Sequence, residues 1–322
     1  MADATAAPRR RMVISQELVL VVALIAALLI LTVTADRFMT VPNLLNQGRL
    51  MTEVALVALP MTFVIITGGI DLSVGSIMGL TAILLGVFWQ NVGLPLPAAA
   101  GLAIACGAFA GFFNGLLVTR LRVPPLIATL ATLALYRGLA EGISQARSVR
   151  GYPEWFYVLG QKDVLGVPTQ LWLLLVAIVI FWVVLSRTTF GRSLYAIGHN
   201  ETAARYSAIR VDRIKLIVYT LSGLMAGIAG VIFVSRVSTT RSDMGTGLEL
   251  DVIAAVVLGG TSIFGGIGTI AGTVLGFTLI QLLKNGLALT GVKGDATIVV
   301  IGTVLILLIL VTNFLQYRRG GG

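Results

Sequence analysis

The sequence has few charged residues and almost no cysteine or histidine. Of its 322 residues, 57% are hydrophobic and only 11% are charged, whereas soluble domains carry about 25% charged residues. This shortage argues against a soluble protein, and apolar windows recur from Leu18 to Leu315 with only short polar breaks. The chain is therefore expected to be one membrane domain over residues 1–322, with no part left for a soluble catalytic domain.

Metal and redox chemistry lack the residues they need. The single cysteine, Cys106, lies in an apolar stretch and can form no intrachain disulfide. The single histidine, His199, lies in a basic loop, where a solvated side chain is the simplest interpretation. One histidine argues against both a histidine proton relay and a multi-histidine metal site.

Motifs for ATP binding and for catalysis are also missing. No Gly-x-x-x-x-Gly-Lys-[Ser/Thr] loop occurs, so no bound cofactor is expected and any ATP would be used by a partner subunit. No Gly-x-Ser-x-Gly or His-Glu-x-x-His motif supports an intramembrane hydrolase or transferase. The net charge of +9 comes from basic residues in short loops and not from one stripe, which argues against nucleic acid. Transport is therefore favoured over an enzyme.

Apolar windows of about 20 residues predict transmembrane helices. The first follows Arg9, Arg10 and Arg11 but is longer than the core of a signal peptide, so an uncleaved helix is favoured. Ten helices are predicted, at 18–35, 53–67, 74–90, 95–119, 125–144, 168–186, 214–236, 250–264, 267–291 and 295–314. The expected fold is all-α and polytopic.

Basic residues indicate the orientation. An even number of spans places both termini on one side, and 13 of the 23 Lys and Arg residues then share that side, against eight on the other. Six of the 13 cluster in the loop at 187–215. By the positive-inside rule, the N-terminal segment 1–17, this loop and the C-terminus are cytoplasmic, while 145–167 faces outside.

Two spans are interrupted by similar glycine pairs. The breaks lie at 66–76 and 258–266, and superposing the pairs also matches Gly75 with Gly266. Backbone freed by such a break must be satisfied by protein or water, and paired breaks in two halves point to a transport pathway. Chance similarity and tight helix packing through small residues are the alternatives. The candidate pathway residues are Gly68, Gly69, Asp71, Ser73, Gly259, Gly260, Thr261 and Ser262.

Four charged residues fall inside predicted spans. Each would cost about 2.5 to 3.5 kcal/mol at a span centre unless it faced protein or water. Glu141 and Lys284 lie near span ends, where snorkelling is the simpler account. Asp71 and Arg137 are the better functional candidates, with a structural ion pair as the alternative.

The loop at 191–206 is too polar to cross a membrane and too patterned for a plain linker. Asn200 can cap a short helix that has Glu201 in its first turn and Ala203, Ala204 and Arg205 behind it. Such a helix would present these side chains to the cytoplasm, where a partner could dock. The alternative is an amphipathic turn that rests on lipid headgroups.

Five segments that run through nearly the whole chain resemble a known family in content and order. They are the Gly-Gly-Ile-Asp-Leu-Ser-Val-Gly-Ser run at 68–76, Asn114-Gly115, Tyr136-Arg137-Gly138, the loop at 191–206, and Val257-Leu258-Gly259-Gly260 with Gly265-Gly266. Together they resemble the ribose/xylose-type permeases of ABC importers, and short matches around 206–209 and 241–245 are similar to the rhamnose and autoinducer-2 branches.

The resemblance implies about ten helices in the vitamin-B12-importer-like arrangement, in a bacterial inner membrane. It implies a second permease subunit, identical or related, two cytoplasmic ATPase subunits and an extracytoplasmic sugar-binding protein. It adds Asn114, Tyr136 and Arg137 to the pathway and makes 200–206 a coupling helix, with Gly198 before it. The chain departs from the family at Ala208, where glycine is common and alanine tolerates positive φ poorly.

The sequence thus predicts the permease subunit of an ATP-driven importer of a monosaccharide or sugar-like molecule, of the pentose, hexose, rhamnose or autoinducer-2 class. An ion-coupled sugar transporter that uses an intramembrane carboxylate such as Asp71 is the alternative.

Overall fold

The computed structural model describes residues 16–292, 296, 299–300, 302–303 and 306. Nearly all of its regular structure is helical. Four helices form the first part of the chain: α1 (Gln16–Thr34), α2 (Val41–Ile66), α3 (Val74–Gly86), which continues into a π-helical turn η1 (Val87–Asn91), and α4 (Leu96–Thr119). Then follow α5 (Pro125–Ser144), the 3₁₀ turn η2 (Glu154–Val158), the hairpin strands β1 (Asp163–Val164) and β2 (Val167–Pro168), and α6 (Thr169–Arg187). The last part contains α7 (Thr189–His199), α8 (Glu201–Tyr206), α9 (Val211–Val237), α10 (Leu248–Leu258) and α11 (Ile270–Leu289).

The prediction of an all-α polytopic protein is confirmed. Eight helices in the described residues are long and apolar enough to cross a membrane. The count of ten is not confirmed: the predicted span at 250–264 is the 11-residue helix α10, which is too short to cross a bilayer, and most of the predicted span at 295–314 lies outside the described residues.

Helix α2 begins at Val41, well before the predicted start at 53. The first half of α2 carries polar residues, so a search for apolar windows left it out of the predicted span. These polar residues have protein partners. Gln47 is buried and accepts from Gln281 at 2.7 Å, and Glu53 binds Arg236 at 2.7 Å. Residues from Ala55 to Ile66 are also buried, so α2 runs through the centre of the molecule.

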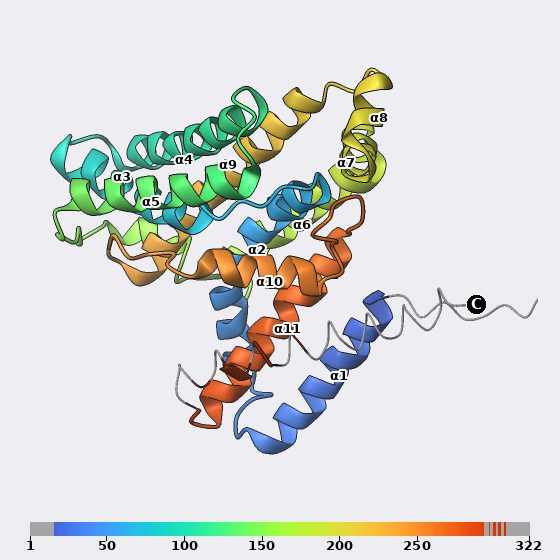
Figure 1. The fold of residues 1–322 in the computed structure, drawn as a ribbon. Coiled ribbons are helices and arrows are strands. Elements are labelled where there is room, and N and C mark those ends of the chain that lie inside the picture. Colours follow the sequence, from blue (N-terminus) through green and yellow to red (C-terminus); the bar gives the residue numbers. More distant parts are fainter. Residues whose placement is uncertain (1–15, 293–295, 297–298, 301, 304–305, 307–322) are drawn as a thin grey trace, which may run out of the picture.

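Helices α4 and α9 pack closely through glycines. A Cβ atom on Gly111 would press on the Tyr219 carbonyl and the Gly223 backbone, and one on Gly223 would press on Gly107 and Gly111. By contrast, α1, α5 and α6 leave many large apolar side chains exposed, as lipid-facing helices do. In Figure 1, α1 lies at the lower edge of the molecule beside α11, against which it packs.

Two joined loops lie at one end of the molecule, and two short helices lie at the other. At one end, Val149 N donates to Thr240 Oγ1 at 3.0 Å and Gln161 donates to Ser238 at 2.7 Å, which joins the 145–168 and 238–247 loops. We call this the loop end. At the other end, α7 and α8 lie together at the upper right of Figure 1; we call this the α8 end.

Candidate functional site

The first glycine break forms a buried polar cluster around Asp71. Helix α2 ends at Ile66, Gly68 takes a φ of 78°, and α3 begins at Val74. Asp71 Oδ1 accepts from the backbone N and the Oγ of Ser73 at 3.0 and 2.7 Å, while Oδ2 accepts from Ser222 Oγ at 2.9 Å. Asp71 and Ser73 are wholly buried.

Two residues from α4 and α5 extend this cluster. Asn114 Nδ2 donates to Ser73 Oγ at 2.7 Å, and Tyr136 Oη donates to the Ala110 carbonyl at 2.9 Å, with Asn114 Oδ1 3.3 Å away. Asn114 and Tyr136 are both buried. Four of the predicted pathway residues, Asp71, Ser73, Asn114 and Tyr136, thus lie in one hydrogen-bonded cluster, which we call the Asp71 cluster.

Arg137, the residue after Tyr136, does not join this cluster. Its Nη1 donates to the carbonyls of Ser242 and Met244, the latter at 2.9 Å. The absence of a side chain at Gly79 leaves room for it, since a Cβ there would lie 2.9 Å from Arg137 Nη1. Asp71 accepts from two hydroxyls and one backbone N–H, and Arg137 donates to carbonyls, so these two residues do not form an ion pair with each other.

The second break follows α10 and is a series of turns. Gly260, Gly265 and Gly266 all have positive φ, at 92°, 88° and 76°, a region that suits glycine. Ser262 N donates to the Ile267 carbonyl at 3.0 Å. Thr261 is buried and its hydroxyl has no hydrogen-bond partner in the described residues. Gly259 packs against Gly272 on α11 so closely that a Cβ would clash.

The two breaks touch each other and also touch α7. Gly266 N donates to the Ile66 carbonyl at 2.9 Å. A Cβ on Gly198 would press on this same carbonyl and on Gly266 N, and Tyr195 Oη donates to the Gly268 carbonyl at 2.7 Å. We call this meeting point of Ile66, Gly198 and Gly266 the Gly198 junction. It connects the α7–α8 segment to both breaks.

The predicted capping of the short helix α8 is confirmed. Asn200 Oδ1 accepts from Ala203 N at 2.9 Å, as an N-cap residue does. Glu201 lies between Lys215 at 2.6 Å and Arg205 at 2.8 Å, and Arg205 also binds Asp212 at 2.6 Å. Partial burial acts to raise the pKa of Glu201, but its bonds to Lys215 and Arg205 outweigh burial and lower that pKa. These charges fix α8 against the start of α9.

The prediction that α8 presents Ala204 to the cytoplasm is wrong. Ala204 is buried with Ile197 and Val211 in a small apolar cluster, because one face of this short helix packs against the end of α7 and the start of α9. Ala203 and Arg205 are exposed, as predicted, and Glu201 is partly exposed. Tyr206 was not among the predicted site residues, although 89% of its surface is exposed.

Three other residues near the breaks were not predicted. Ser222 and Tyr219 lie on α9, far along the chain from Asp71, and Tyr195 lies on α7. The Tyr219 hydroxyl is buried beside Gly69 and has no hydrogen-bond partner in the described residues. A serine or a tyrosine in an apolar span is a weak signal on its own, because serine is common at helix packing interfaces and tyrosine at membrane interfaces.

The chain is similar over most of its length to bacterial import permeases. The chain is 41% identical over 301 residues to the ribose import permease protein RbsC of Escherichia coli K12, covering 91% of this chain and 92% of that protein. It is 41% identical over 285 residues to RbsC of Bacillus subtilis 168, covering 88% of each chain. It is 37% identical over 307 residues to the autoinducer 2 import system permease protein LsrD of E. coli K12, covering 92% of each. A family model described as branched-chain amino acid transport system / permease component also matches residues 43–309, and the chain therefore belongs to this family of transport permeases.

Proposed function

We propose that the chain is the membrane-spanning permease subunit of an ATP-driven, binding-protein-dependent importer of a monosaccharide or sugar-like molecule. The observation that carries this proposal is the similarity, over about nine-tenths of the chain, to permeases named for import of ribose and of autoinducer 2. The chain would make no covalent change to its substrate. Its finer specificity within the pentose, hexose, rhamnose and autoinducer-2 classes would rest largely on the binding protein.

The partner that uses ATP would be a cytoplasmic ATPase that receives α8. This helix is anchored by ionic bonds to α9 and exposes Ala203, Arg205 and Tyr206, a small knob of the kind that fits a groove on a partner. The Gly198 junction supports the same role, because a displacement of α7 and α8 would press directly on both breaks. An extracytoplasmic binding protein and a second permease, identical or related, would complete the importer.

The pathway would open at the two breaks. In this structure the Asp71 cluster is buried, and the Thr261 and Tyr219 hydroxyls are buried without partners. A transported solute cannot reach buried groups, so import through the breaks requires a second conformation in which they are accessible. We therefore propose that the structure is an occluded state of a transporter that alternates between two accesses.

Uptake into proteoliposomes tests the function directly. The chain is reconstituted with its ATPase and binding protein, and labelled D-ribose, L-rhamnose and autoinducer 2 are supplied outside. We expect uptake of one of them that stops on ATP depletion and survives an uncoupler. Uptake that stops with the uncoupler and survives ATP depletion would instead establish the ion-coupled alternative, in which Asp71 is the coupling carboxylate.

Cysteine accessibility tests the pathway. Single cysteines at Ser73 and Thr261, in a chain whose Cys106 is replaced by alanine, should resist a small hydrophilic thiol reagent in the occluded state, because both positions are buried. Reaction should appear when the nucleotide state of the ATPase is changed. If neither cysteine reacts in any nucleotide state of an active transporter, the breaks are packing devices.

A further inference from the structure

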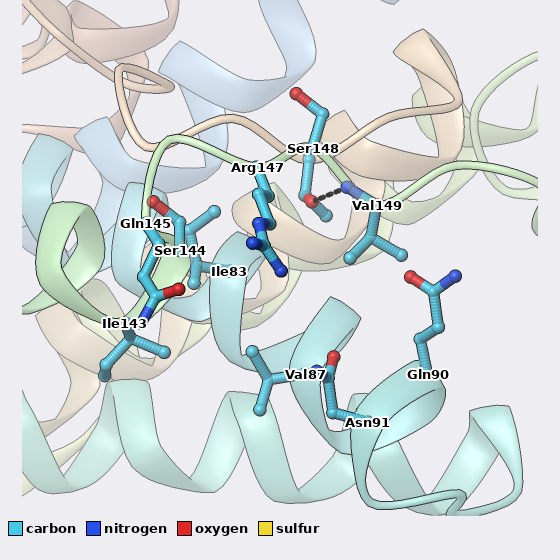
Figure 2. Close-up of a pocket in the computed structure, with 11 residues that line it drawn as sticks. Ile83, Val87, Gln90, Asn91, Ile143, Ser144, Gln145, Arg147, Ser148 and Val149 are labelled. Carbon is cyan, nitrogen blue, oxygen red and sulfur yellow. Dashed lines mark hydrogen bonds between the residues drawn. The ribbon is translucent and has the colours of Figure 1, made fainter.

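A cavity of about 380 Å³ opens at the loop end, away from the Asp71 cluster. It lies between α3 with its π-turn η1, the end of α5, and the loop at 145–149 (Figure 2). Thr240, from the 238–247 loop, closes one side and holds Val149 N at 3.0 Å. No residue that lines the cavity belongs to the predicted pathway or to the coupling loop, so neither role accounts for it.

The cavity has an apolar floor and a polar rim. Ile83, Val87 and Val149 supply aliphatic surface. The rim carries Gln90 and Asn91 from η1 and Arg147 and Ser148 from the loop. Figure 2 shows Arg147 pointing from the loop toward η1, while Asn91 and Gln90 point from η1 toward the loop.

These four rim side chains have free hydrogen-bonding groups. All four side chains are solvent-exposed, and within the described part of the chain none of them makes a hydrogen bond or an ion pair with another residue. Two carboxamides, a guanidinium and a hydroxyl together offer both donors and acceptors, with donors in excess. The cavity therefore presents unpaired polar groups around an aliphatic surface, as sites for small polar ligands do.

The backbone around the cavity departs from regular geometry in two independent places. The π-turn η1 places both Gln90 and Asn91 on the rim. Such turns are rare in proteins, and many of those that occur lie at functional sites. On the opposite side, Gln145 and Ala146 have φ of 48° and 58°, a conformation that costs non-glycine residues free energy and clusters at binding sites. Gln90, Asn91 and Gln145 line the cavity, and Ala146 lies between the lining residues Gln145 and Arg147.

We propose that this cavity binds a small neutral polyhydroxylated molecule of the monosaccharide class. Sugar hydroxyls both donate and accept, which matches the carboxamides of Gln90 and Asn91, and the guanidinium of Arg147 adds donors in a fixed fork. The C–H face of a sugar ring matches the floor of Ile83 and Val87. The volume lies at the small end of the range for ligand pockets, about 300 to 1,000 Å³, which suits one sugar ring and not a larger solute.

The identity of this ligand rests on the proposed function, because the transported sugar is then the molecule that reaches the loop end. The cavity would hold it between release from the binding protein and entry toward the breaks. Binding to the permease alone is therefore the property to measure, since it requires neither ATP nor the partner proteins.

The test is sugar binding to the whole chain in lipid nanodiscs, followed by saturation-transfer NMR with D-ribose and L-rhamnose as probes. We expect at least one probe to bind, and we expect Arg147→Met and Asn91→Leu each to weaken that binding about tenfold, the effect of losing one hydrogen bond to a charged or amide group. Arg150→Met is the matched control, because Arg150 lies on the same loop but does not line the cavity. All variants should elute and melt as the unmodified chain does.

Two outcomes would overturn the proposal. One is that neither probe binds the unmodified chain; the other is that Arg147→Met and Arg150→Met bind equally well. Failure of the proposed function would be seen elsewhere, as uptake by the unmodified importer that does not depend on ATP. A cavity that binds sugar in a chain without ATP-dependent uptake would therefore refute the function and retain the site.

Discussion

Ala208 adopts a left-handed backbone at the turn that follows α8, with φ of 61°. This is the position where the resembled family commonly has glycine, and the sequence-based concern about alanine is confirmed by the observed geometry. The left-handed conformation costs an L-residue about 1 to 2 kcal/mol, and part of this is offset because alanine restricts the unfolded chain. The turn is nevertheless closed, since Ile209 N donates to the Ala204 carbonyl at 3.1 Å.

We expect Ala208→Gly to stabilise this turn by about 0.5 kcal/mol, the difference between relieved strain and added chain entropy. Amide hydrogen exchange over residues 200–212 should then slow about twofold. Ala203→Gly is the matched control: Ala203 is exposed and helical, so glycine should destabilise α8 by about 1 kcal/mol and speed exchange. Faster exchange in both variants would show that Ala208 is not strained.

At the residue scale, the sequence identified polar residues that need partners but did not identify the partners themselves. Asp71 was singled out because a charge in a span needs a partner, and this is correct. Its partner Ser222 lies on α9 and not near Asp71 in sequence, so no spacing argument could find it. The same limit applies to Arg137, whose acceptors are backbone carbonyls of the 238–247 loop that have no sequence signature.

At the scale of elements, α8 places two neighbouring alanines in different environments: Ala203 is exposed and Ala204 is buried. Ala203→Trp adds its ring on the exposed face and should leave insertion and stability unchanged, while it overfills the groove of an ATPase. We expect the reconstituted importer to lose transport, and its ATP hydrolysis to stop responding to the loaded binding protein. Normal, substrate-stimulated transport by this variant would remove α8 from the mechanism.

Ala204→Trp is the matched comparison for Ala203→Trp. Ala204 packs against Ile197 and Val211, so an indole there overpacks this cluster and should cost about 1 to 3 kcal/mol of local stability. Faster hydrogen exchange across α7 and α8 should accompany its loss of transport. A turn that merely rested on lipid headgroups would accept tryptophan at Ala203, and that variant would then transport normally.

The Gly198 junction gives a second prediction at this scale. A methyl group at Gly198 would press on the Ile66 carbonyl and on Gly266 N, and backbone atoms cannot move away as a flexible side chain can. Gly198→Ala should therefore leave the ATPase bound to α8 but reduce transport about tenfold or more, because the breaks no longer follow α7.

Gly138→Ala is the control for this substitution. It also adds one methyl group to a helix, but a Cβ there meets no atom within 4 Å, so transport should be unchanged. Co-purification of the ATPase measures docking, and uptake measures coupling. Equal transport by Gly198→Ala and the unmodified chain would mean that the junction does not carry the motion.

Element boundaries were predictable where apolar periodicity was unbroken and failed where polar residues have tertiary partners. Helices α4, α5 and α6 match their predicted ranges closely. The start of α2 was missed because its first residues include polar ones, and Gln47 among them is satisfied by Gln281 on α11. The predicted span at 250–264 was too long because Gly259 and Gly260 end α10 early and allow α11 to pack against it.

At the scale of the whole molecule, the chain has two chemically distinct ends. In both breaks, the chain arrives by a helix that comes from the loop end and leaves by a helix that returns toward it. Glu17, near the start of α1, accepts from Thr269 at 2.8 Å, which places the beginning of α1 near the second break at the α8 end. The loop at 145–168 lies at the opposite end, bound to the 238–247 loop. This arrangement is compatible with a cytoplasmic α8 end and an outer loop end, which the basic residues of the 187–215 loop favour.

Labelling of introduced cysteines tests this orientation in intact cells. In a Cys106→Ala background, Ser193→Cys lies on α7 at the α8 end and Ser148→Cys lies on the exposed loop after α5. A membrane-impermeant maleimide added outside should label Ser148→Cys, and should label Ser193→Cys only after the membrane is permeabilised. The physical reason is that moving the six basic residues of the 187–215 loop across the bilayer during insertion is strongly disfavoured. Labelling of Ser193→Cys from outside would reverse the orientation, and the α8 end would then lie beyond the reach of any cytoplasmic ATPase.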